Sequence, residues 1–355
     1  MSRYIKSKKR NRKKIEKKLF NNSNKYLFKF NNHFSTIDEE ITPKHESKNN
    51  LFGSTGNDYL YGFEGNNKYQ FGTGYDVIDY SYLPENITLI RGGTVNKGSL
   101  GIDQFTDFYE KIIATKNNND WIDGISNGGF IASLEIDLSY KKLIINNLPG
   151  IGAISSQIEK FEHISGTNNS DKLIGDSSNN ILLGNDGNDF LFGKSGRDTI
   201  EGDLGQDIIY GGLGKDYLKG GEDIDTFIYK NPRESRLTKN NKTRKIDWIS
   251  DFNTNEDKIY FSDAVEQESF IFLGNLNYLS ERNINKALQQ SFLSDFDAVG
   301  FNLISNNKTF IAINGSNKGF QSKNDLIIDI TGFSGEIENI NIFNGKCHNN
   351  FKFNI

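Results

Sequence analysis

Acidic side chains recur at a fixed spacing of nine residues in the middle of the chain, from residue 166 to residue 229. In each nine-residue unit an acid or its amide stands at the sixth place and an apolar side chain at the eighth. The sixth places are Asp171, Asn180, Asp189, Asp198, Asp207, Asp216 and Asp225. Carboxylate oxygens are ligands that hard divalent cations such as Ca²⁺ prefer. A repeat with this chemistry predicts a series of cation sites rather than one catalytic centre.

The same unit predicts the elements that must hold these acids. Every unit opens on Gly, and four units also have Gly at the fourth place, where a positive φ is accessible at little cost. We expect six residues to form a tight turn and the last three to form a short strand whose middle side chain points inward. These inward side chains are Leu173, Leu182, Leu191, Ile200, Ile209, Leu218 and Phe227. Because each turn and strand reverse the chain, two units should complete one coil of eighteen residues.

Stacked coils would line up the sixth-place side chains in two columns. One column holds Asp171, Asp189, Asp207 and Asp225, and the other holds Asn180, Asp198 and Asp216. Carboxylates about 5 Å apart, one strand spacing, would repel each other. A calcium ion between stacked turns, bound also by the carbonyls of the Gly-rich turns, removes this repulsion. Named by their first residues, the pairs of turns that can stack are 166/184, 184/202, 202/220, 175/193 and 193/211.

A shorter block with the same pattern covers residues 53–79, in units that begin at 53, 62 and 71. Its sixth places are Asp58, Asn67 and Asp76, and we predict that Asp58 and Asp76 share one further calcium ion. Phe71 replaces the opening Gly of the third unit. The predicted metal ligands of both blocks are therefore Asp58, Asp76, Asp171, Asn180, Asp189, Asp198, Asp207, Asp216 and Asp225.

These units resemble the G-G-x-G-x-D-x-U-x nonapeptide of RTX, or haemolysin-type calcium-binding, proteins. A flexible Gly-rich linker would not explain why the acids and the apolar side chains keep the same phase. Residues 158–167 resemble the phrase that precedes a second repeat block in such proteins, and residues 246–263 resemble the phrase that closes many arrays. In this closing phrase Asp247, Asp251 and Asp257 fit either added ligands or solvated surface acids.

The resemblance implies an all-β fold: a parallel β-roll with β-rich flanking regions and a small α+β C-terminal cap domain. It also implies Ca²⁺ as the bound ion, export through a type I secretion apparatus with an uncleaved C-terminal signal, and a secreted, extracellular or cell-surface location. The tail after residue 280 is similar to the C-terminal domain of bluetail-type bacterial surface proteins. Further partners would be a cell surface or other copies of the chain.

We expect five segments along the chain. They are a basic, disordered tail at 1–50, a short repeat block at 51–80, a strand-rich non-repeating region at 81–165 that continues the coil, the main repeat block at 166–230, and a C-terminal capping and secretion domain at 231–355. Within the last segment, Ser280–Leu293 has the apolar periodicity of a short amphipathic helix.

Charge and hydropathy are unevenly distributed. Residues 1–20 carry ten Lys/Arg and one Glu, a charge of +9, and because the net charge is −4 the remainder carries −13. An acidic body suits a cation-binding protein. The basic run is not followed by the apolar core of a signal peptide, and it fits a disordered tail or a contact with an anionic surface better than nucleic-acid binding. No apolar run is long enough for a transmembrane segment.

Catalytic motifs are few. The sequence has no H-E-x-x-H zinc motif, four scattered histidines and a single cysteine, Cys347. Residues 124–128 match G-x-S-x-G, but the segment that follows predicts a strand where a hydrolase needs a helix. We therefore expect a structural or adhesion-type protein rather than an enzyme. The alternative is a secreted enzyme acting on polysaccharide or lipid, since sequence alone does not separate a catalytic carboxylate pair from calcium ligands.

Overall fold

The computed structural model describes residues 40–41, 48–90, 93–124, 132–148, 150–237, 245–261, 270–291, 298–314, 319–322 and 324–344. Most of the basic N-terminal segment, the serine of the G-x-S-x-G match and Cys347 lie outside these ranges. Within them, no helix has both the length and the apolar character needed to cross a membrane.

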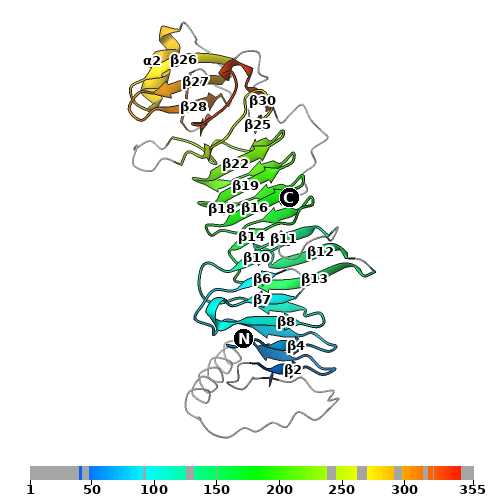
Figure 1. The fold of residues 1–355 in the computed structure, drawn as a ribbon. Helices are drawn as coiled ribbons and strands as arrows, with labels where there is room; N and C mark the ends of the chain where they lie inside the picture. Colours follow the sequence, from blue (N-terminus) through cyan, green and yellow to red (C-terminus); the bar gives the residue numbers. More distant parts are fainter. Residues whose placement is uncertain are drawn as a thin grey trace. The chain divides into compact units, whose positions relative to one another are not determined.

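The main repeat block forms two parallel sheets whose strands stack at intervals of eighteen residues (Figure 1). In the first sheet Leu173 pairs with Leu191, which pairs with Ile209 in turn. The parallel β-roll predicted from the nine-residue period is therefore confirmed. The first sheet contains β15 (Lys172–Ile174), β17 (Phe190–Phe192), β20 (Ile208–Tyr210) and β23 (Thr226–Tyr229), and the second contains β14 (His163–Ser165), β16 (Ile181–Asp186), β19 (Thr199–Leu204) and β22 (Tyr217–Glu222). β18 (Ser195–Gly196) and β21 (Leu213–Gly214) pair between turns.

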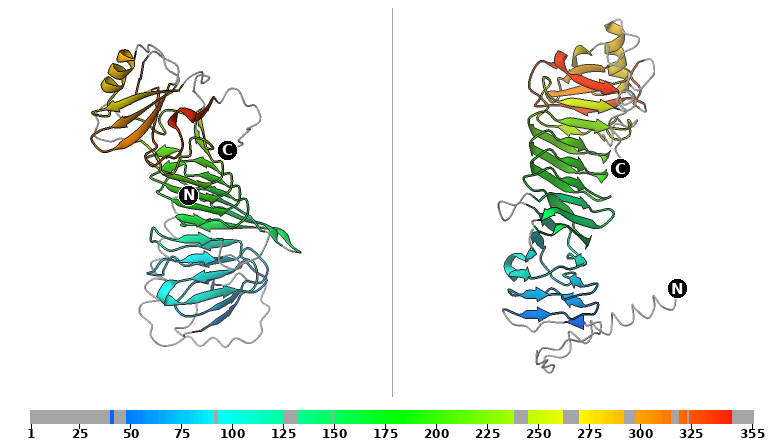
Figure 2. Two further views of the ribbon diagram at one scale, coloured as in Figure 1. Left: turned by 45° about the horizontal axis from the view of Figure 1, so that its top comes forward. Right: turned by 90° about the vertical axis from the view of Figure 1, so that its right-hand side faces the viewer.

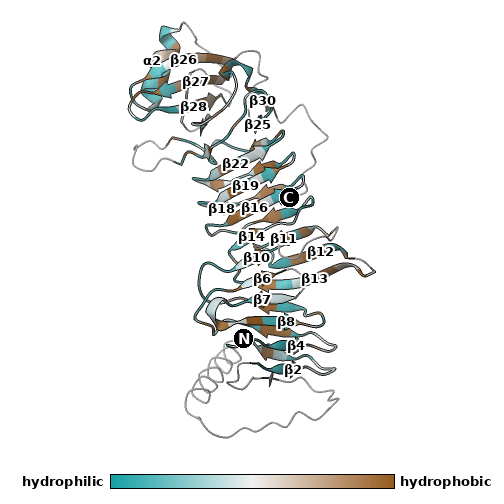
Figure 3. Ribbon diagram, in the orientation of Figure 1, coloured by the Kyte–Doolittle hydropathy of each residue, from teal (hydrophilic) through white to brown (hydrophobic). Residues whose placement is uncertain are grey.

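The eighth-place side chains fill the space between the two sheets. All seven, from Leu173 to Phe227, are at most 1% exposed. Figure 3 shows the corresponding hydrophobic segments on the strands of both sheets. Each such side chain contributes about 1.5–3 kcal/mol through burial. Because the strands are short, this core is one side chain deep per unit, and the turns must be stabilised by other means.

The short repeat block follows the same geometry. Its strands are β2 (Asn50–Phe52), β3 (Tyr59–Tyr61), β4 (Lys68–Gln70) and β5 (Val77–Asp79). Leu60 pairs with Ile78 at an interval of eighteen residues, and both are fully buried. A two-residue strand, β1 (Glu40–Ile41), pairs with β3, so the coil begins inside the segment expected to be a tail.

Between the two repeat blocks, parallel pairing continues but is interrupted by antiparallel hairpins. β7 pairs antiparallel with β6 and β8, and β12 pairs antiparallel with β11 and β13 (Figures 1 and 2). The elements are β6 (Thr88–Ile90), β7 (Thr94–Asn96), η1 (Gly98–Leu100), β8 (Ile102–Phe105), β9 (Lys111–Ile113), β10 (Trp121–Asp123), β11 (Leu134–Asp137), β12 (Lys142–Leu148) and β13 (Gly152–Glu159).

The C-terminal segment continues both sheets and adds a second core. β24 and β25 extend the two sheets of the repeat block, and β29 and β30 pair with them. Helix α2 begins one residue after the expected start, because Ser280 is its N-cap and accepts a hydrogen bond from Asn283 N. The helix ends at Gln290, and the expected end at Leu293 lies outside the described residues. The elements are β24 (Trp248–Ile249), β25 (Lys258–Phe261), β26 (Phe270–Leu276), α2 (Glu281–Gln290), β27 (Ala298–Leu303), β28 (Lys308–Ile313), β29 (Leu326–Asp329), η2 (Ile337–Asn339) and β30 (Asn341–Asn344).

Candidate metal centre

In the main block, each sixth-place aspartate uses one carboxylate oxygen to accept a hydrogen bond from the backbone of the preceding coil. Oδ1 of Asp189 accepts a hydrogen bond from Asp171 N at 2.7 Å, and Oδ1 of Asp207 accepts one from Asp189 N at 2.8 Å. In the other column, Oδ1 of Asp198 accepts from Asn180 N at 2.8 Å. The two predicted columns therefore exist as two ladders of hydrogen bonds. The eighteen-residue strand register fixes this spacing.

In five of these aspartates the second oxygen has no hydrogen-bond donor among the residues that the structure describes. Oδ2 is buried and accepts no hydrogen bond in Asp189, Asp198, Asp207, Asp216 and Asp225. All five residues are at most 2% exposed. A buried carboxylate oxygen without a donor is costly, so it calls for a proton or a cation. A calcium ion fits this requirement, because it would supply positive charge to each buried Oδ2 atom that lacks a donor.

These orphan oxygens converge on glycine carbonyls of the next coil. A methyl group built on Gly184 would lie 2.4 Å from Asp189 Oδ2 and 2.7 Å from the carbonyl oxygen of Gly202. The same two kinds of oxygen meet at Gly193, where they come from Asp198 and from the next coil. Only glycine leaves this space open. The space is thus lined by carboxylate and carbonyl oxygens together, which is the ligand set of Ca²⁺.

The cation chemistry here depends on the backbone as much as on side chains. In the part of the chain that the structure describes, no three or more His, Cys, Asp or Glu side chains gather as a metal-binding group. An ion between two turns would therefore take most of its ligands from carbonyls, as the Gly-rich turns predict. Asp189, Asp198 and Asp207 mark the pairs 184/202, 193/211 and 202/220 as those with an orphan oxygen facing the next turn.

Burial strongly perturbs the acids of the columns. It raises the pKa of Asp189, Asp198 and Asp225 to about 8, and neighbouring carboxylates of the same column add to each shift. Burial likewise raises the pKa of Asp207 and of Asp216 to about 7. The ladder hydrogen bonds oppose these shifts without cancelling them. Without a cation, these groups hold protons close to neutral pH, so a cation must displace them.

The first two units of the main block satisfy their sixth places with protein donors. Asp171 accepts hydrogen bonds from Leu134 N and Thr167 N. Asn180 accepts from Asp176 N at 2.9 Å and donates from Nδ2 to the carbonyl of Glu162 at 2.8 Å. Both units lack Gly at the fourth place. The pairs 166/184 and 175/193 are therefore weaker candidates than the three inner pairs.

In the short block, Asp58 and Asp76 come together as predicted. Asp76 Oδ1 accepts from Asp58 N at 2.8 Å. A methyl group built on Gly53 would lie 2.7 Å from Asp58 Oδ2 and 2.0 Å from the carbonyl of Phe71. Phe71 thus presents the same carbonyl as the glycine it replaces. Burial raises the pKa of Asp76 to about 6, so this carboxyl is less perturbed than those of the main block.

Two further acids extend the columns into the closing phrase. Asp247 Oδ1 accepts from Asp216 N at 2.8 Å, and Asp257 Oδ1 accepts from Asp225 N at 3.0 Å. Asp247 and Asp257 are 0% and 3% exposed, so they are not solvated surface acids. Their offsets from the previous rung are 31 and 32 residues, which a nine-residue period does not find. The sequence signal that could have identified both acids is an Asp followed two places later by Ile, as in the repeat.

Asp251 instead covers the last turn of the array. Its two oxygens accept from Gly220 N at 3.0 Å and Gly221 N at 2.9 Å.

One complete unit was also missed in the region expected to be non-repeating. Gly98, Gly101, Asp103 and Phe105 occupy places one, four, six and eight of a nonapeptide. β8 pairs with β4 at an interval of 36 residues, because the β6–β7 insertion lies between them. The interval of 36 residues is four nine-residue units, so this unit keeps the phase of the short block, but the two stretches between, which begin at 80 and 89, lack the pattern.

Another aspartate that links two coils, Asp120, lies farther along the same region. Asp120 Oδ1 accepts from Ile87 N at 2.7 Å, in the manner of the main columns. Its Oδ2 accepts from Thr115 N at 2.9 Å and from Thr115 Oγ1 at 2.7 Å. Protein donors therefore satisfy both oxygens, and this coil needs no cation.

Comparison with known proteins identifies the repeats. The family model of the RTX calcium-binding nonapeptide repeat (4 copies) matches residues 46–78, 165–200 and 192–227. Among solved structures, the solution structure of the AlgE6R3 subunit from the Azotobacter vinelandii mannuronan C5-epimerase is 19% identical, over 52% of this chain and 83% of that chain, with a TM-score of 0.23. A TM-score this low supports no inference. The comparison with curated proteins gives no match.

Proposed function

Because this chain is an RTX-type protein with calcium-binding nonapeptide repeats at residues 46–78 and 165–227, we propose that its β-roll folds on binding extracellular Ca²⁺. We further propose that it is a secreted or cell-surface protein with a structural or adhesion-type role, not an enzyme. The observation that carries the calcium proposal is the set of buried Oδ2 atoms without a donor among the described residues, in five sixth-place aspartates and in Asp247. Calcium would supply the positive charge that these atoms and the turn carbonyls lack.

Some atoms of the chain would align the coils, and others would bind the ion. Oδ1 of Asp207 accepts the amide of Asp189 and so fixes the distance between two coils. Oδ2 of Asp189, with the carbonyl of Gly202, then faces the space between the turns. The buried position excludes water, which strengthens the attraction between an ionised carboxylate and a cation.

Folding should then depend on the calcium concentration. Extracellular modules bind calcium with Kd values of about 10⁻⁴ to 10⁻³ M. A ligand that binds only the folded state stabilises it by mass action. Free calcium inside cells is far below these values, so the array would stay unfolded there. Such a chain could pass a type I secretion apparatus unfolded and fold outside.

A calcium titration of the whole chain, followed by circular dichroism, tests the folding proposal. We expect strand signal to rise as calcium approaches millimolar concentration, and a chelator to reverse the rise. The transition should be cooperative, because each coil contacts only its neighbours. An identical spectrum in calcium and in chelator would falsify calcium-coupled folding.

Location and role need separate measurements. Cells that produce the protein are fractionated from their medium, with and without calcium, and we expect the protein in the medium or on the surface. The purified protein in calcium should bind cell envelopes or self-associate. Retention inside the cells would contradict secretion, and turnover of polysaccharide or lipid would favour the enzymatic alternative.

A further inference from the structure

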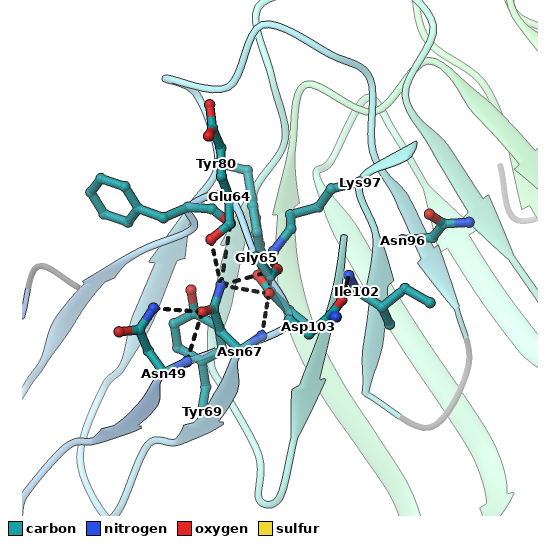
Figure 4. A network of polar contacts seen from close by, with 12 residues as sticks. Asn49, Glu64, Gly65, Asn67, Tyr69, Tyr80, Asn96, Lys97, Ile102 and Asp103 are labelled. Atoms are coloured by element: carbon teal, nitrogen blue, oxygen red, sulfur yellow. Dashed lines mark hydrogen bonds and ion pairs between the residues drawn. The ribbon is translucent and has the colours of Figure 1, made fainter. Parts of the chain in front are cut away.

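A lysine is buried completely between a turn of the short repeat block and the turn at 98–103. The side chain of Lys97 is 0% exposed. Its Nζ donates hydrogen bonds to the carbonyl of Gly65, at 2.9 Å, and to Oδ1 of Asp103 (Figure 4). Lysine is almost never fully buried unless it is paired. The position of this ammonium group therefore needs an explanation.

Lys97 lies between two turns that stack in the same way as the calcium-type turns. Asp103 Oδ1 accepts from Asn67 N at 3.1 Å, in the same way that Asp207 Oδ1 accepts from Asp189 N. A methyl group on Gly101 would lie 2.6 Å from the carbonyl of Gly65. In the main block, fourth-place glycines approach fourth-place carbonyls in the same way. The turns at 62–67 and 98–103 are thus a stacked pair of repeat turns.

This stacked pair has no vacant acceptor of the calcium type. Asp103 Oδ2, unlike the orphan Oδ2 atoms, accepts a hydrogen bond from Tyr80 OH at 2.9 Å. Asn67 Nδ2 donates to Asp103 Oδ1 at 2.9 Å and also points at the carbonyls of its own turn, with Phe63 O at 3.2 Å (Figure 4). The carbonyls that would face an ion in a repeat turn here accept N–H donors.

We propose that the Lys97 ammonium is a tethered cation that takes the place of a calcium ion between these two turns. This rests on the proposed function of the main block. The consequence is that the turns at 62–67 and 98–103 form without calcium and exclude it. A covalently attached cation is present at a fixed local concentration, so its effect does not depend on the medium. This pair of turns is then a calcium-independent starting point for the coils around it.

Charge balance supports this assignment. Asp103 is 0% exposed, so an ionised carboxylate there needs a counter-charge close by. Burial lowers the pKa of Lys97 and raises that of Asp103, and the attraction between the two charges opposes both shifts.

Hydrogen exchange measured by mass spectrometry on the full chain tests the proposal, in calcium and in chelator. In the wild type, the turns at 62–67 and 98–103 should keep the same protection in both media. Lys97→Met should speed exchange there by about tenfold or more in both media, because Asp103 loses its counter-charge and the Asn67 amide still blocks an ion. The double variant Asn67→Asp/Lys97→Ala restores the acid and removes the ammonium, so calcium should protect these turns again and one more calcium ion should bind.

Two matched controls keep the test decisive. Asn67→Asp alone retains Lys97, so its number of bound calcium ions should equal that of the wild type. Lys111→Met removes a half-buried lysine that pairs with Glu159 at 2.8 Å nearby, and it should leave the turns protected in both media. An extra ion in Asn67→Asp, calcium-dependent protection of these turns in the wild type, or no added ion in the double variant would each overturn the proposal. Calcium-independent exchange at 166–230 would instead contradict the proposed function.

Discussion

At the scale of single residues, the two oxygens of each sixth-place aspartate have separate roles. Oδ1 aligns the coils, and this role is the same in Asp207, Asp103 and Asp120. The partner of Oδ2 differs. Oδ2 of Asp207 has no hydrogen-bond donor among the described residues, Oδ2 of Asp103 accepts from Tyr80 OH, and Oδ2 of Asp120 accepts from Thr115. We propose that the identity of this second partner decides whether a coil needs a metal ion. A consensus acid is therefore not by itself a calcium ligand.

Asp207→Asn should remove the calcium ion between the turns at 202 and 220 and retain the hydrogen bond between the coils. The amide oxygen can still accept from Asp189 N, but the amide nitrogen would face the carbonyls of the turn, as in Asn67. One lost ion should cost about 2–3 kcal/mol of free energy of unfolding when calcium exceeds its Kd a hundredfold. Denaturant unfolding in calcium and in chelator measures this loss.

Asp58→Asn is the control for Asp207→Asn. Asp58 Oδ2 already accepts from Ser54 N at 2.6 Å, so the calcium-dependent part of the free energy of unfolding should change less. Equal small losses in both variants would argue against the columns.

In chelator, acid should stabilise the folded array. The folded-state pKa of Asp189, Asp198 and Asp225 is about 8, above the ordinary value of 3.8, so the folded state binds more protons than the unfolded state. This contribution is fully present below about pH 4 and is lost as the pH rises towards 8. Strand signal in chelator should therefore be greater at pH 5 than at pH 8. A greater signal at pH 8 would contradict the raised pKa values.

At the scale of elements, the nine-residue period predicted the strands of the repeat blocks and their pairing. Three-residue strands such as Lys172–Ile174 follow from a turn of fixed length, and one inward side chain per strand fixes the register. The prediction was wrong for β16, β19 and β22, which run six residues each, into the part of the unit expected to form the turn. The period also predicted the two columns, because stacking depends only on the eighteen-residue coil. Local chemistry alone was sufficient for these features.

Features set by contacts between distant segments were not predicted. The antiparallel β12–β13 insertion has no signature in the nine-residue pattern. Asp247 and Asp257 join the columns only because β24 and β25 pair with strands more than thirty residues earlier. The partners of Asp103 depend on the fold that brings Lys97 and Tyr80 to it. The spacing in the sequence identified the acids, whereas the donors to their Oδ2 atoms can be known only from the folded structure.

Leu191→Ala should destabilise the array even in saturating calcium. Leu191 is 0% exposed and lies between Leu173 and Ile209. Deleting a buried leucine side chain typically costs about 2–5 kcal/mol, because a cavity remains. Leu204→Ala, at a leucine that is 49% exposed, should change the free energy of unfolding by about 0.5 kcal/mol or less. Denaturant titration compares the two, and similar values would contradict a core made of eighth-place side chains.

At the scale of the whole molecule, the residues that the structure describes form two hydrophobic cores. The long core runs through the repeat sheets and depends on the turns that flank it. The second core lies between α2 and strands β26 to β29 and includes Ile284, Leu288 and Phe301. The hydrophobic residues of the second core all come from outside the repeat units. The two cores should therefore respond differently to calcium.

Chelator should expose the main block and leave α2 protected. Hydrogen exchange in peptides from 166–230 should speed up when calcium is removed, whereas peptides from Glu281–Gln290 should keep their protection. The helix is stabilised by its own cap and by the second core, neither of which uses a calcium-type turn. Loss of protection in both regions at the same calcium concentration would show that the cores unfold together.

The ladder of backbone amides and Oδ1 atoms has a direction. The amide of Asp207 is held by Asp225, and the amide of Asp225 is held in turn by Asp257, so each acceptor is supplied by sequence that comes later. A polypeptide that emerged carboxyl end first would present every incoming coil with an acceptor already in place, and assembly could proceed like a zipper closed from one end. If the amino end emerged first, the backbone amides of each coil would lack an acceptor until the next coil had emerged.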